Sequence, residues 1–109
     1  MSEARPPAHL LKHGKALFIA LHDEFRIDDA AGMTLLIAAC ECLDRMRAAQ
    51  AAIKEYGEIV TDRYGQVKVN PACQLEKDAR NGLLAALKAL DLGDDPPPIP
   101  GIRQHRRQT

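Results

Sequence analysis

Apolar residues recur at steps of three and four positions in three separate stretches of this sequence. A helix has about 3.6 residues per turn, so this spacing places the apolar side chains on one face of a helix. The first stretch contains Leu10, Leu11, Gly14, Leu17, Phe18, Leu21 and Phe25, and the third contains Leu75, Ala79, Leu83, Ala86, Leu87 and Leu90. The periodicity predicts three main helices, at about residues 7–25, 29–56 and 71–92.

Residues that favour helix ends stand at these boundaries. Asp28 or Asp29 can accept hydrogen bonds from the free N–H groups that open the second helix, and Gly57 can take the left-handed conformation that ends it. Asn70 is a suitable N-cap for the third helix, and a proline follows it where a missing N–H costs nothing. Gly93 is expected to end the third helix.

Strand character is found between the second and third helices. Two short segments rich in β-branched residues, Ile59-Val60-Thr61 and Gln66-Val67-Lys68-Val69, flank an Asp-Arg-Tyr-Gly sequence. Gly65 supplies the positive φ of a tight connection, so we expect a small β-hairpin at about residues 59–69. Because an isolated two-stranded hairpin is marginal in water, it should lie against the helices or against a neighbouring subunit.

Length and composition support an all-α fold with one small hairpin. A chain of 109 residues forms a single core, and aromatic residues make up only 4% of it, which favours helices over sheets. Residues 1–7 end in two prolines and are expected to be a flexible leader. We expect a single helical domain at 8–93 and a flexible, proline-rich tail with a basic end at 94–109.

The second helix carries a signal for assembly. Its first half, Met33–Cys40, is apolar almost all the way round, which would expose an apolar patch on the surface of a monomer. Part of this surface is therefore expected to face another subunit, so the protein should be oligomeric. The candidate interface residues are Leu35, Leu36 and Ile37 in the helix, with Val67 and Val69 in the hairpin.

The overall charge excludes a protein that coats nucleic acid by bulk electrostatics, because fifteen Lys and Arg balance fifteen Asp and Glu. The scattered basic residues are Lys12, Lys15, Arg63, Lys68, Arg103, Arg106 and Arg107. On one chain they are too few for a nucleic-acid face, and each could be ordinary solubilising charge. In a ring, however, every one of them is repeated, and contacts with phosphate would add up.

No catalytic or metal-binding constellation is apparent. His9 and His13 stand four apart on the first helix, but a third ligand is not evident, and solvated helix histidines are the preferred interpretation. His22 lies further along the helix. Cys73 falls in the first turn of the third helix, where a thiol pKa can be lowered, yet a nearby base is not indicated. We therefore expect no enzymatic activity and no cofactor.

The cysteines and the hydropathy pattern bear on location. The cysteine count is three, an odd number, and a secretory leader is not seen, so we expect a reducing cytoplasm. None of the apolar runs approaches the ~20 residues of a membrane span, so a membrane partner is not expected.

The second half of the chain resembles a known family. Three segments are similar to the small subunit of tailed-bacteriophage terminases. They are Val60-Thr61-Asp62-Arg63-Tyr64-Gly65-Gln66-Val67-Lys68-Val69-Asn70-Pro71-Ala72, then Glu76-Lys77-Asp78-Ala79-Arg80, and finally Leu90-Asp91-Leu92. Asn70 stands where the family commonly has His, a change that keeps the helix cap. The leader is also shorter than the basic arm that many relatives carry.

The resemblance implies a non-enzymatic, ring-forming component of a viral genome-packaging motor in the host cytoplasm. It implies two partners, double-stranded viral DNA and the large ATPase and nuclease subunit. We expect phosphate contacts from Arg63, Lys68, Arg103, Arg106 and Arg107.

Two alternatives stay open. One is a small helical adaptor that binds only protein, with the proline-rich tail as a docking peptide. The other is a metal-dependent hydrolase that uses His9, His13 and His22.

Overall fold

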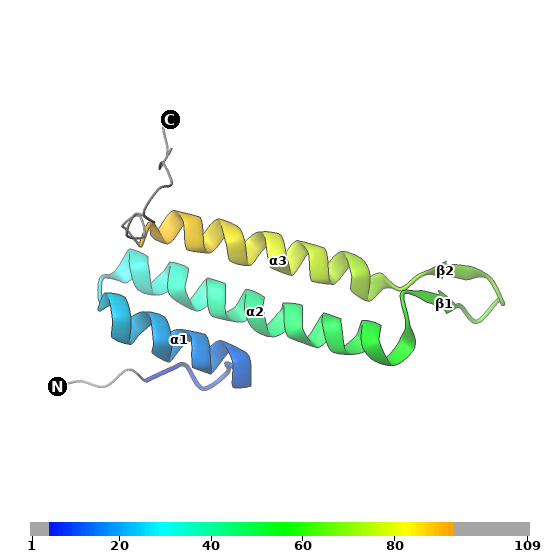
Figure 1. Cartoon of the computed structure of the whole chain (residues 1–109), viewed down its shortest axis with the longest axis horizontal. Coiled ribbons are helices and arrows are strands. Elements are labelled where there is room, and N and C mark those ends of the chain that lie inside the picture. Colours follow the sequence, from blue (N-terminus) through cyan, green and yellow to red (C-terminus); the bar gives the residue numbers. More distant parts are fainter. Residues whose placement is uncertain (1–4, 93–109) are drawn as a thin grey trace, which may run out of the picture.

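The computed structural model describes residues 5–92. In chain order its elements are α1 (Lys12–Phe25), α2 (Ala30–Tyr56), β1 (Ile59–Thr61), β2 (Val67–Val69) and α3 (Pro71–Leu90) (Figure 1). The mostly helical fold with one small hairpin is therefore confirmed.

The longest helix, α2, lies between the other two (Figure 1). On one side α1 runs beside the first half of α2, and on the other side α3 packs along it. This central position accounts for the apolar character of Met33–Cys40, because α1 and the last turns of α3 cover much of it. The main apolar cluster is formed by Leu10, Phe18, Ile27, Leu36 and Cys40, with Met33, Ile37 and Leu90 among the side chains packed against it.

The first helix begins later than expected. The backbone from Pro7 makes a turn in which the Leu10 N–H donates to the Pro7 carbonyl at 3.1 Å, and regular helix starts only at Lys12. The N-cap residue, Leu11, has no polar side chain to cap the helix. The predicted start at about residue 7 was wrong because a different helix supplies the cap.

That cap is the carboxylate of Asp44 in α2. Its Oδ2 accepts the N–H of Leu11 and its Oδ1 accepts the N–H of Gly14, both at 2.7 Å. Gly14 is required for this approach, since a Cβ built there would lie 2.3 Å from Asp44 Oδ2 and 2.9 Å from the Cys40 carbonyl. A buried negative charge at the positive end of α1 is electrostatically favourable and joins α1 to α2.

The remaining helix ends largely follow the sequence. Asp29 caps α2 by accepting the Gly32 N–H at 2.8 Å. Gly57 follows the helix with φ 89° and ψ 166°, a positive φ but an extended backbone instead of the expected left-handed one. Helix α3 ends at Leu90 instead of 92, because Asp91 takes the left-handed conformation and donates its N–H to the Lys88 carbonyl. Gly93, the expected end, lies outside the described residues.

Small side chains allow α3 to approach α2 closely. Ala72, Ala79 and Ala86 are buried at steps of seven residues along α3, and Ala49 is buried on α2. Leu75, the first residue of the predicted apolar stripe, is 61% exposed although it lies on the same side of α3 as Ala72 and Ala79.

Candidate DNA-binding and assembly surfaces

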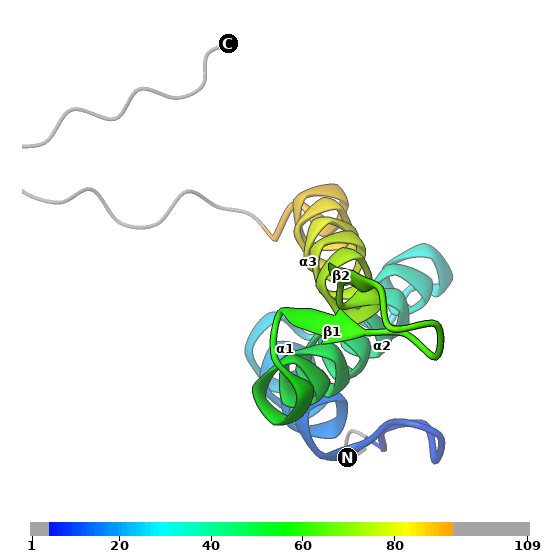
Figure 2. The same cartoon turned by 90° about the vertical axis from the view of Figure 1, so that its right-hand side faces the viewer.

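The hairpin projects past the end of α2 and does not lie against the helices (Figures 1 and 2). Its strands are antiparallel, with Ile59 opposite Val69 and Thr61 opposite Val67. Residues directly opposite each other share a face, so Ile59, Val67 and Val69 form one surface, which we call the apolar hairpin face. These three side chains are 57%, 70% and 61% exposed.

Asp62 holds the turn of the hairpin. Its Oδ1 accepts the N–H groups of Tyr64 at 2.8 Å and of Gln66 at 3.0 Å, and its carbonyl accepts the Gly65 N–H at 3.0 Å. Gly65 has φ 81°, as expected for the tight connection. These bonds fix the backbone on both sides of Arg63, which therefore stands at the tip.

Two of the predicted phosphate contacts lie on this hairpin. The Arg63 guanidinium carbon is 5.4 Å from the centre of the Tyr64 ring, which is itself 77% exposed. Lys68 is exposed on the face opposite the apolar hairpin face, since it pairs with Val60. Within residues 5–92 neither cation takes part in an ion pair, so both charges are open to an external partner. Arg103, Arg106 and Arg107 lie outside the described residues.

Asn70 joins the hairpin to both long helices. Its Oδ1 accepts the Ala72 N–H at 2.9 Å and so caps α3, as its sequence position predicts. Its Nδ2 donates to the Gly57 carbonyl at 2.8 Å, and its backbone N–H donates to the Glu58 carbonyl at 2.7 Å. The side chain is 7% exposed, so one buried amide sets the position of the hairpin relative to α2 and α3.

The predicted interface residues fall into different environments. Val67 and Val69 lie open on the apolar hairpin face, whereas Leu35 and Ile37 are half-buried on α2, where Ile37 packs against the main apolar cluster. Leu36 is 0% exposed and belongs to the chain's own core, so its assignment to a subunit interface was wrong. A side chain without accessible surface cannot contact a second chain unless the core opens. Sequence analysis missed Ile59, although its strand pairing with Val69 follows from the hairpin register.

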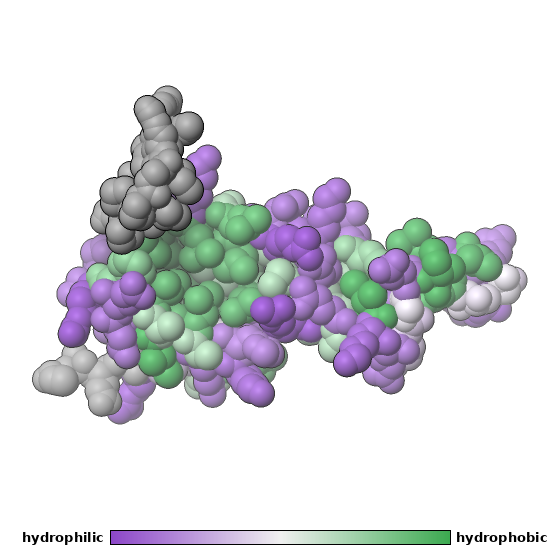
Figure 3. Space-filling model, viewed as in Figure 1, coloured by the Kyte–Doolittle hydropathy of each residue, from purple (hydrophilic) through white to green (hydrophobic). Residues whose placement is uncertain are grey.

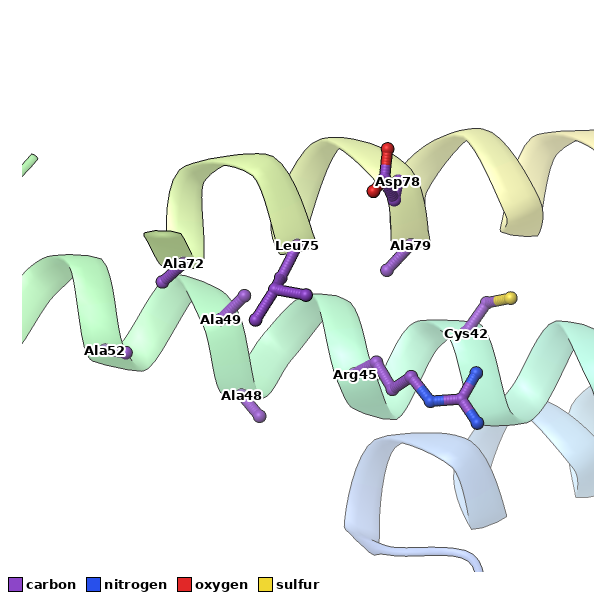
Figure 4. A pocket seen from close by; sticks show the side chains of 9 residues that line it. All are labelled: Cys42, Arg45, Ala48, Ala49, Ala52, Ala72, Leu75, Asp78 and Ala79. Carbon is purple, nitrogen blue, oxygen red and sulfur yellow. The ribbon is translucent and has the colours of Figure 1, made fainter. Parts of the chain in front are cut away.

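A groove between α2 and α3 was not predicted at all. It has a volume of about 440 Å³, and its floor is formed by alanines of both helices with Leu75 at its side (Figure 4). Arg45 and Asp78 are the charged side chains that line it. The groove arises because alanines recur on the surfaces of α2 and α3 that face each other. It could not be predicted, because the residue pattern of one helix does not show which other helix it faces. In the view of Figure 3, apolar surface is seen over the helices and again on the hairpin, with polar side chains between.

Among the described residues, two ionisable groups have clearly shifted pKa values. Burial, and next the carboxylates of Asp44 and Glu41, raise the pKa of the Cys40 thiol to about 12. On the surface of α3, a hydrogen bond from Gln50 lowers the pKa of Glu76, and Arg80 contributes in the same direction. The Glu76 carboxylate accepts the Gln50 amide at 3.1 Å and pairs with Arg80 one turn later, which links α2 to α3.

The structure does not assemble the histidines into a metal site. His9 Nε2 lies 2.7 Å from Glu41 Oε2, an exposed pair. His22 stacks on Phe18, with ring centroids 5.9 Å apart. Residues 5–92 contain no group of three His, Cys, Asp or Glu side chains placed to hold a metal ion. The cysteines at positions 40, 42 and 73 are free.

The fold and these surfaces define a small, mostly helical protein with a projecting β-hairpin. A family model described as phage terminase, small subunit, matches residues 20–93, more than half of the chain, and the protein belongs to that family. The resemblance seen in the sequence is therefore confirmed, and it supports a role in phage packaging. No curated protein and no solved structure matches the chain. In the described part of the chain, every helix is too short or too polar to cross a bilayer.

Proposed function

We propose that this protein is the non-enzymatic DNA-recognition component of a phage genome-packaging motor. It assembles into a ring, binds double-stranded viral DNA and engages the large ATPase and nuclease subunit. Family membership supports the packaging role, and DNA binding rests on one structural observation: the projecting hairpin presents Arg63 and Lys68 without an ion-pair partner among the described residues.

Repetition of this hairpin in a ring provides the charge that a single neutral chain lacks. Each subunit would add the same two cations, and the segment carrying Arg103, Arg106 and Arg107 would add more. The contacts we propose are with phosphates, which position the duplex without reading its bases. The proline-rich segment 94–109 is our proposed docking segment for the large subunit.

The test is DNA binding over a series of salt concentrations. Replacing Arg63 and Lys68 together by Ala should weaken retention of a double-stranded fragment about tenfold or more. The slope of log affinity against log salt should become shallower by about 0.9 for each phosphate that the variant no longer neutralises. Replacing Lys12 and Lys15 together by Ala is the matched control, because it also removes two exposed cations and α1 lies away from the hairpin (Figure 1).

Two results would contradict the proposal. Equal weakening in the control that lacks Lys12 and Lys15 would show that general charge, and not the hairpin, attracts DNA. If the purified oligomer fails to retain DNA even at low ionic strength, an adaptor that binds only protein becomes the better assignment, because an apolar interface does not weaken steeply with salt.

A further inference from the structure

The apolar hairpin face and the α2–α3 groove are two apolar surfaces, on different parts of one chain, that are not covered by other described residues. The hairpin has strands of three residues each and is tied to its own helices only at its base, by Asn70, so a partner surface against its apolar face would stabilise it. Its three exposed apolar side chains would otherwise face water.

We propose that the hairpin of one subunit docks, apolar face first, into the α2–α3 groove of a second copy of this chain. The proposal rests on the assembly proposed above and specifies its contact. The groove of about 440 Å³ is roughly three times the size of a 150 Å³ cavity that holds one benzene, so it has room for several aliphatic side chains. A chain cannot fill its own groove in this conformation, because its hairpin points away from the helices.

The charges of the two surfaces are compatible with this contact. The apolar hairpin face carries no charged side chain, since Ile59, Thr61, Val67 and Val69 occupy all its positions. The charged residues of the groove, Arg45 and Asp78, stand beside its alanine floor (Figure 4) and form no ion pair within residues 5–92. Docking therefore buries apolar surface against apolar surface without leaving a cation or carboxylate unpaired at the centre.

The contact has two consequences for the assembly. It joins different surfaces of the two copies, so it is head-to-tail and generates a ring when the rotation closes. It also leaves Lys68 on the outer face of the docked hairpin, because alternate residues of a strand point to opposite faces. The same hairpin can then hold a neighbour with one face and present a cation with the other.

Cysteine cross-linking tests the contact directly, because Cys42 already lines the groove. The experiment uses Val67→Cys in the full chain with Cys73→Ser, treated with a short bismaleimide. We expect a ladder of covalent dimers, trimers and higher species on a denaturing gel. Cys40 should stay unmodified, since it is 0% exposed.

Two matched controls accompany this variant. Adding Cys42→Ser should abolish the ladder, and Lys68→Cys, one residue along and on the opposite face, should give little or none. Dimers that persist without Cys42 would indicate a hairpin-to-hairpin contact and would overturn the proposal. An oligomer, or a monomer, that forms no Cys42 cross-link would overturn it as well.

A second measurement uses two exposed leucines of α3. Leu75 borders the groove and Leu84 does not, and they are 61% and 57% exposed, so Glu at either position should leave the fold intact. Leu75→Glu should raise the protein concentration at which half of the chains are assembled at least about tenfold, whereas Leu84→Glu should not change it. A tenfold change corresponds to about 1.4 kcal/mol of association free energy, the contribution of one buried apolar contact. Equal effects would overturn the docking site. Salt-sensitive DNA retention by an oligomer without this contact would still uphold the proposed function.

Discussion

At the scale of single residues, Asp44 makes the most consequential contact. It is an aspartate in the middle of a helix, 9% exposed, and both of its oxygens accept backbone N–H groups of another helix. The spacing of residues in α2 shows which side of the helix carries Asp44, but it does not show what this side contacts. The partners come from the packing of α1, whose first N–H groups point at the carboxylate. A buried carboxylate is stable here because both oxygens have donors.

We predict that Asp44→Asn lowers the free energy of unfolding by about 2 kcal/mol. The amide keeps one accepting oxygen, but its NH₂ group faces an N–H donor, so the variant lacks one charge-assisted hydrogen bond worth about 1.5–3 kcal/mol. Urea unfolding at a fixed protein concentration measures the effect. Asp28→Asn, at an exposed position before α2, should change stability by less than about 0.5 kcal/mol. Similar destabilisation in both variants would rule out the capping role.

Cys40 should make stability depend on pH in the alkaline range. Its pKa is raised by burial from 9.0 to about 12, so between these values the unfolded chain loses the thiol proton while the folded chain keeps it. Its contribution is complete below pH 9 and falls as pH rises, by about 1.4 kcal/mol per pH unit. The stability difference between the native sequence and Cys40→Ala should therefore shrink as the pH is raised above 9. Parallel pH profiles for the two proteins would contradict this.

At the scale of elements, the hairpin depends on the residue that follows it. Its own strands make few backbone bonds, and Asn70 connects its base to the end of α2 and the start of α3. The hairpin can thus be loosened without unfolding the helices.

We predict that Asn70→Asp keeps the cap of α3 but frees the hairpin. The carboxylate can still accept the Ala72 N–H, while the donor to the Gly57 carbonyl is replaced by an oxygen that repels it. Amide hydrogen exchange in residues 59–61 and 67–69 should accelerate at least about tenfold, which corresponds to about 1.4 kcal/mol, with little change in the core of α2. Asn81→Asp, on the exposed side of α3, is the control. Unchanged exchange in the hairpin would show that Asn70 does not hold it.

At the scale of the whole molecule, α2 serves as the common partner of α1 and α3. Both neighbours cover much of its apolar first half, which accounts for a large part of that pattern within one chain. Exposed apolar side chains stand on the hairpin and beside the α2–α3 groove, and others stand on α1 and the second half of α3, namely Ile19, Phe25 and Leu84. The candidate surfaces for a subunit contact are therefore the apolar hairpin face and the groove, beside the half-buried Leu35 and Ile37.

Local features of the sequence determined the number, order and most ends of the elements, because caps such as Asp29 and Asn70, the positive φ of Gly65 and the spacing of apolar residues act over a few neighbouring positions. Tertiary structure decided what depends on distant partners. The start of α1 is set by Asp44, which lies thirty residues after Gly14 in the sequence. Leu36 belongs to the core because α1 covers it. The groove exists only where the alanine-bearing faces of α2 and α3 meet. A one-dimensional pattern records which face of a helix is apolar, but not which neighbour will cover it.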